Sequence, residues 1–92
     1  MNYGVVGMDL LKSVSGLELL TGMIAGKYPQ PPIAQLLDMH LVEATPGRAV
    51  FEAHPNISLY NPLGTVHGGF AATILDSCMA CAVQTMLAKI GG

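Results

Sequence analysis

The chain has 92 residues, of which 51% are hydrophobic and only 11% are charged, where about a quarter is usual for a soluble domain. A domain of this size buries only about 60% of its unfolded surface, so this apolar excess favours self-association or additional chain that covers it. The net charge of −2 and four scattered basic residues argue against a nucleic-acid partner.

The sequence predicts neither a secretory signal nor a membrane-spanning helix. The amino terminus, MNYGVVGMDLLK, has no basic segment before an apolar one and so does not resemble a secretory signal. The longest apolar region, residues 70–88, carries Asp76, Ser77 and Gln84, which would be costly in lipid. We therefore expect a soluble, cytoplasmic protein with no membrane partner.

The first predicted element is a helix over residues 16–25. Ser15 and Glu18 have the spacing of a capping box, in which each side chain accepts a hydrogen bond from a backbone N–H of the first turn. Apolar residues follow at helical spacing, and Gly26 suits a left-handed residue just past the end. The three prolines of the next segment, KYPQPPI, predict an extended linker.

Two antiparallel strands are predicted after this linker. Apolar side chains recur at every second position, at 37, 39 and 41 and again at 49, 51 and 53, which is the two-residue period of strands with one buried face. Pro46-Gly47 predicts the turn between them. A third, short extended segment is expected at residues 57–60.

The longest predicted element is a helix that begins near His67 or Gly68 and continues to Ile90, with no proline or glycine after its first turn. Apolar residues occupy nearly all of its faces, which is typical of a helix that is buried on every side. Asp76 is the only formally charged side chain between positions 53 and 88. We therefore expect this carboxylate to lie in apolar surroundings.

Two parts of an active site are predicted on this helix, namely its amino-terminal N–H groups and the carboxylate of Asp76. The first N–H groups of a helix lack acceptors and bear a partial positive charge, so Gly68 and Gly69 suit an anion or a polarised carbonyl oxygen at close range. An unsolvated carboxylate at Asp76 would be a competent base. Eight residues of helix separate them by roughly 12 Å, so one reaction can use both only if a second subunit supplies one of them. This predicts a dimer.

Cys78 and Cys81 form a C-x-x-C pair on one side of the predicted helix, an arrangement that permits redox or metal chemistry. The sequence has no second cysteine pair and no histidine at ligand spacing. We therefore interpret both as small buried core residues and predict no metal site.

The motif N-x-x-G-x-x-H-G-G, followed by Asp76 on the helix, resembles the signature of the hotdog-fold acyl-CoA thioesterases, in particular the phenylacetyl-CoA thioesterase-like branch. The similarity extends from about residue 15 to 88. The resemblance implies an α+β hotdog fold, in which a curved antiparallel sheet wraps a long central helix. Family members continue past that helix with about three more strands. We therefore expect residues 1–92 to form a single, partial hotdog thioesterase domain, truncated after the central helix.

The resemblance further implies hydrolysis of an acyl-CoA thioester to a free acid and coenzyme A, without a cofactor, in a homodimer or dimer of dimers. The Gly68 N–H would stabilise the oxyanion, and Asn61 would position the carbonyl group or the attacking water. Asp76 of the opposite subunit would act as general base or nucleophile. His67 and Gly69 would have supporting roles, the first by orienting the turn and the second by permitting close approach.

Two alternatives remain open at this point. A noncatalytic hotdog remnant would bind acyl-CoA or only dimerise. A hotdog hydratase acting on enoyl-CoA would be expected to carry a histidine about five residues from the helical aspartate. No histidine follows Asp76 in the sequence, so the hydratase is the least favoured enzyme.

Overall fold

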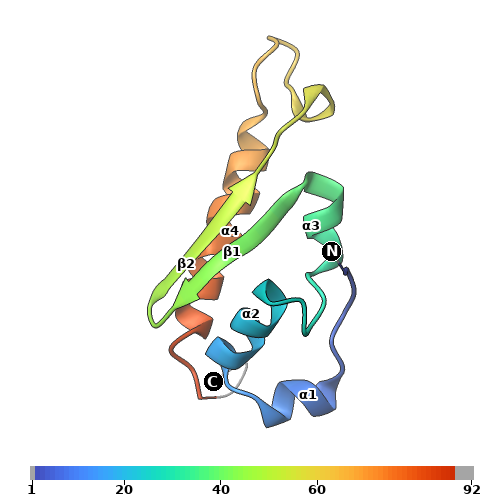
Figure 1. The fold of residues 1–92 in the computed structure, drawn as a ribbon. Helices are drawn as coiled ribbons and strands as arrows, with labels where there is room; N and C mark the ends of the chain where they lie inside the picture. Colours follow the sequence, from blue (N-terminus) through green and yellow to red (C-terminus); the bar gives the residue numbers. More distant parts are fainter. Residues whose placement is uncertain (1, 89–92) are drawn as a thin grey trace.

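The computed structural model describes residues 2–88, which form an α+β arrangement of four α-helices and one two-stranded antiparallel sheet (Figure 1). The elements in chain order are α1 (Met8–Ser13), α2 (Gly16–Ile24), α3 (Pro32–Leu37), β1 (Met39–Thr45), β2 (Arg48–Ala53), the 3-10 helix η1 (Ile57–Leu59) and α4 (Gly68–Gln84). The coarse α+β prediction is confirmed.

The first predicted helix is confirmed as α2. The Glu18 N–H donates to Ser15 Oγ at 3.1 Å and the Ser15 N–H donates to Glu18 Oε1 at 3.4 Å, so both halves of the capping box are formed. Gly26 follows the helix with φ +83°, which a glycine adopts without steric cost. Helix α1 was not predicted.

The prediction of an extended linker and of a strand from residue 37 is wrong in part. Helix α3 begins at Pro32, because a proline fits the first helical position, where no N–H is required and its fixed φ is already helical. It ends at Leu37 and is followed by the C-cap residue Asp38, whose left-handed backbone (φ 48°) turns the chain into β1.

The predicted hairpin is confirmed: β1 and β2 pair antiparallel, and Gly47 takes φ +78° in the turn. The pairing slips between Leu41 and Glu43, where a bulge inserts one residue. The bulge changes the alternation, so that Met39, Leu41 and Ala44 all point into the core. The predicted third extended segment is wrong. Residues 57–59 form η1 instead, beginning at an N-cap asparagine that accepts a backbone hydrogen bond.

The core lies between the hairpin and two helices. Helix α2 packs on β1, and α4 packs along β2 (Figure 1). Leu20, Leu41 and Ala44 form its centre, with Phe51 and Cys81 packed against them. The two helices also meet at their ends. A Cβ placed on Gly16 would lie 1.8 Å from the backbone oxygen of Gln84, so this contact requires a glycine.

Helix α4 begins at Gly68, as predicted, and ends at Gln84 rather than Ile90; position 90 lies outside the described residues. The prediction that this helix is buried on every side is wrong. Phe70 is the only buried residue among residues 68–84. The two strands and α2 cover one side of the helix, and its other side is open. None of the helices within residues 2–88 is both long and apolar enough to cross a membrane.

Candidate functional site

The site begins in a narrow loop that leads into α4. Tyr60 and Val66 pair as an isolated antiparallel bridge. Inside the loop, the Asn61 side chain accepts hydrogen bonds from the N–H groups of Leu63 (3.0 Å) and Thr65 (3.2 Å) and donates to Thr65 Oγ1 (2.8 Å). The Asn61 amide therefore holds the loop together. One of its N–H groups is left for a ligand, since a carboxamide has two.

The Gly68 N–H at the tip of α4 has no partner among the described residues. His67 is the N-cap, and its Nδ1 accepts a hydrogen bond from the Gly69 N–H at 2.8 Å. The imidazole thereby fixes the first turn, with its proton on Nε2 when neutral. Within residues 2–88, the Gly68 N–H makes no hydrogen bond. Apart from the adjoining backbone, no atom lies within 4 Å of the place that a Gly68 Cβ would take, and the residue is exposed.

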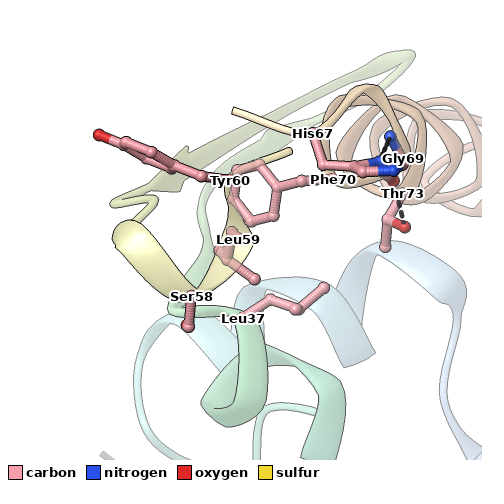
Figure 2. A pocket seen from close by; sticks show the side chains of 8 residues that line it. All are labelled: Leu37, Ser58, Leu59, Tyr60, His67, Gly69, Phe70 and Thr73. Carbon is pink, nitrogen blue, oxygen red and sulfur yellow. Dashed lines mark hydrogen bonds between the residues drawn. The ribbon is translucent and has the colours of Figure 1, made fainter. Parts of the chain in front are cut away.

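An open cleft of about 320 Å³ lies beside this tip. Figure 2 shows its lining, with the Phe70 ring between the loop and the first turn of α4. Thr73 Oγ1 donates to the Gly69 carbonyl oxygen at 2.9 Å, one turn along the helix. Sequence analysis did not identify Leu37, Ser58 or Thr73 as lining residues, because no pattern in the sequence brings their three segments together.

A second cavity, of about 210 Å³, lies between α4, α2, α3 and the hairpin. Its lining is largely apolar and includes Met23, Ile33, Met39 and Phe51. Gln30 is a polar lining residue that is 2% exposed. Its side-chain amide donates a hydrogen bond to the Leu41 carbonyl oxygen and accepts one from the Leu41 N–H. Asp76 is the only formally charged residue in this lining. The carboxylate therefore stands at the edge of a cavity that suits an apolar chain.

The structure does not bring the two predicted parts together within one protomer. Asp76 and Gly68 lie on the same helix, eight residues or roughly 12 Å apart along its axis. The expectation that apolar neighbours bury Asp76 is wrong for the single protomer, where this residue is exposed. The cause is the open side of α4, which no other described element covers.

The cysteine pair consists of two free, half-buried thiols on α4, of which Cys81 packs against the core. Burial raises the pKa of the Cys81 thiol, and the neighbouring Cys78 acts in the same direction. A thiol that holds its proton is a poor nucleophile, which agrees with a packing role. Residues 2–88 contain no group of three or more His, Cys, Asp or Glu side chains arranged to hold a metal ion.

A separate polar cluster, which the sequence did not indicate, joins the amino-terminal segment to the hairpin. The Tyr3 hydroxyl lies 2.7 Å from His40 Nε2, and Asp38 lies within 3.8 Å of ring nitrogens of both His40 and His54. His54 Nε2 also lies 3.0 Å from a Glu52 oxygen. The cluster fixes the end of α3 against the strands.

Comparisons of the chain with protein-family models, with curated proteins and with solved structures found no match. The function is therefore inferred from the chemistry and geometry of these residues.

Proposed function

We propose that the chain is an acyl-CoA thioester hydrolase of hotdog architecture that works as a homodimer. One observation carries the proposal. A free N–H at the uncrowded tip of α4 and a single carboxylate at the rim of an otherwise uncharged, apolar cavity belong to one chain. An acyl chain would occupy the cavity, and its thioester group would lie at the rim.

In this mechanism the Gly68 N–H binds the thioester carbonyl oxygen. The donor is already oriented along the helix axis, and the partial positive charge of the helix start adds to it. As a nucleophile attacks the carbonyl carbon, the developing oxyanion strengthens this hydrogen bond. Donors of this kind contribute about 10²–10³ in rate.

Asp76 activates the nucleophile. As general base it takes a proton from water while the water oxygen bonds to the carbonyl carbon, and the C–S bond then breaks as the coenzyme A thiolate leaves and takes up that proton. As nucleophile, its carboxylate oxygen would bond to the carbonyl carbon while the C–S bond breaks and coenzyme A leaves as the thiolate. Water would then hydrolyse the acyl anhydride, which releases the acid, returns the Asp76 carboxyl group and supplies the proton for the thiolate. Asn61 would orient the carbonyl or the water through its remaining N–H.

A two-fold dimer in which two α4 helices pack antiparallel supplies the required geometry. Ala72 lies midway between Gly68 and Asp76, so a crossing at Ala72 places the Asp76 of one protomer beside the Gly68 of the other. All three residues lie at four-residue spacing on one side of α4, and all three are exposed. The small side chain at the crossing permits the close end of the usual helix spacing, about 8 Å.

The test is hydrolysis of a panel of aliphatic and aryl acyl-CoA esters, with coenzyme A measured by chromatography because a thiol dye would also react with the two cysteines. We expect Asp76→Asn to lose most turnover with unchanged circular dichroism and size. Asp9→Asn, an exposed carboxylate on α1, is the matched control and should keep full turnover. Full turnover by Asp76→Asn, or a wild-type chain inactive on the whole panel, would contradict the proposal.

A noncatalytic hotdog remnant is the second candidate. It is favoured by the exposure of Asp76 in the single protomer and by the use of the Asn61 amide within its own loop. This alternative predicts no turnover by the wild-type chain and the same affinity for acyl-CoA in the wild-type and Asp76→Asn chains.

A further inference from the structure

Two groups of large apolar side chains are exposed on the protomer; the first lines neither cavity, and the second adjoins the cleft through Leu59 and Tyr60. The first, the outer stripe, runs along the open side of α4 and just past its end; its members are 60–65% exposed, namely Leu75, Met79, Val83 and Met86. The second, the tip loop, comprises residues 57–66, where Ile57 and Leu63 are 81% and 88% exposed. Single exposed apolar residues are normal on a protein surface, whereas each of these groups places several of them next to one another.

The tip loop and the outer stripe cannot meet within one chain. The loop joins α4 at its first residue and extends beyond the helix start, away from the sheet and from the later turns of α4 (Figure 1). Fifteen residues of helix separate Gly68 from Val83, a distance of roughly 22 Å. Any direct contact between Leu63 and Val83 must therefore join two copies of the chain.

We propose that the tip loop of each protomer packs on the outer stripe of a second copy, centred on Leu63 against Met79 and Val83. This inference rests on the proposed function, because it uses the antiparallel arrangement of the two α4 helices that the proposed function requires. When Gly68 of one protomer lies beside Asp76 of the other, the chain beyond that helix tip continues over the following turns of the partner helix. Those turns carry the outer stripe.

The surface involved is large enough for a specific contact. Apolar side chains of this size present about 100 Å² each, so the exposed parts of the stripe and loop amount to about 500 Å² per protomer, or about 1,000 Å² for the pair. A specific interface needs about that area, and the crossing of the two helices adds to it. Apart from Asp76, no formally charged residue lies between positions 53 and 88, so the contact buries no other ionised group.

The contact also accounts for the environment that the carboxylate needs. Asp76 is exposed in one protomer, and it stands beside Met79 on the side of α4 that the second copy would cover. Packing of the tip loop there would exclude water from the neighbourhood of the reacting groups. The loop is thus a positioning element for a site made by two chains.

The test is cross-linking between two single-cysteine chains in a background of Cys78→Ala and Cys81→Ala. A chain with Leu63→Cys is mixed with a longer, tagged chain with Val83→Cys and treated with a short bismaleimide. We expect a covalent heterodimer on a denaturing gel. The matched control replaces Val83→Cys by Leu36→Cys, a position on α3 that is 79% exposed and away from the stripe, and it should give little product.

A second measurement applies if cross-linking perturbs the fold. Leu63→Asp should shift the chain from dimer to monomer by light scattering, whereas Leu36→Asp should not. A heterodimer without turnover on any acyl-CoA supports the contact and contradicts only the proposed hydrolase. If turnover depends on Asp76 but cross-linking is equal at positions 83 and 36, or is absent at both, the proposed contact is wrong and the proposed hydrolase is still supported. A wild-type chain that is monomeric at all concentrations overturns both.

Discussion

Replacing Gly68 with proline removes one hydrogen-bond donor from the site and keeps its shape. Proline is favoured at the first position of a helix, which Gly68 occupies. It also restricts the preceding residue to extended backbone, and His67 already has φ −63° and ψ 135°. Apart from the adjoining backbone, no atom lies within 4 Å of the new Cβ.

The expected effect is catalytic rather than structural. The Gly68 N–H makes no hydrogen bond within residues 2–88, so its loss costs the fold nothing, and the free energy of unfolding should change by less than about 0.5 kcal/mol. Loss of an oxyanion donor should lower the rate by about 10²–10³. Gly68→Ala keeps the donor and adds the same Cβ, so it controls for crowding by the new atoms.

The assay compares kcat and KM for acyl-CoA hydrolysis among the wild-type, Gly68→Pro and Gly68→Ala chains, with urea denaturation of each. We expect kcat to fall in Gly68→Pro while Gly68→Ala keeps most of its rate. If the proline chain is folded and as active as the alanine chain, the Gly68 N–H does not hold the oxyanion and the reasoning is refuted.

Two further predictions concern the packing of α4. Gly16→Ala should destabilise the chain by about 3 kcal/mol, the upper end for overpacking, because the new Cβ would lie 1.8 Å from the Gln84 backbone oxygen. Gly4→Ala, whose Cβ would meet Pro29 at an ordinary contact distance of 3.6 Å, should be nearly neutral in the same urea denaturation, and equal midpoints would contradict the contact. Burial raises the pKa of Cys81, so in a Cys78→Ser chain the rate of alkylation by iodoacetamide should rise at a higher pH when the chain is folded than when it is denatured. A rate that rises at or below the ordinary thiol pKa of about 8.5 in the folded chain would contradict the burial.

The elements that sequence analysis located correctly are those that neighbouring residues determine. The capping box at Ser15 starts α2, a glycine with positive φ at position 47 makes the hairpin turn, and α4 starts at Gly68. The prolines of residues 27–33 predict an extended linker because proline breaks a helix interior, but Pro32 occupies the first position of α3, where a helix accepts it.

The burial of α4 could not be predicted in the same way. Apolar residues on every side of a helix indicate that other protein surface packs against it. They do not indicate whether that surface belongs to the same chain or to a second one. The cavity beside Asp76 was equally hidden, since Ile33, Met39 and Phe51 line it from three separate elements. The free donor at Gly68 was predicted, because it follows from where a helix begins.

Complementation between two inactive chains tests the shared site most directly. Gly68→Pro and Asp76→Asn chains are each assayed alone, then unfolded together, refolded as a mixture and assayed again. We predict that the mixture recovers about a quarter of wild-type turnover, because about half of the dimers are mixed and each mixed dimer has one intact site. A mixture no more active than the separate chains, with mixed dimers demonstrated by tagged chains, would contradict a site made by two protomers.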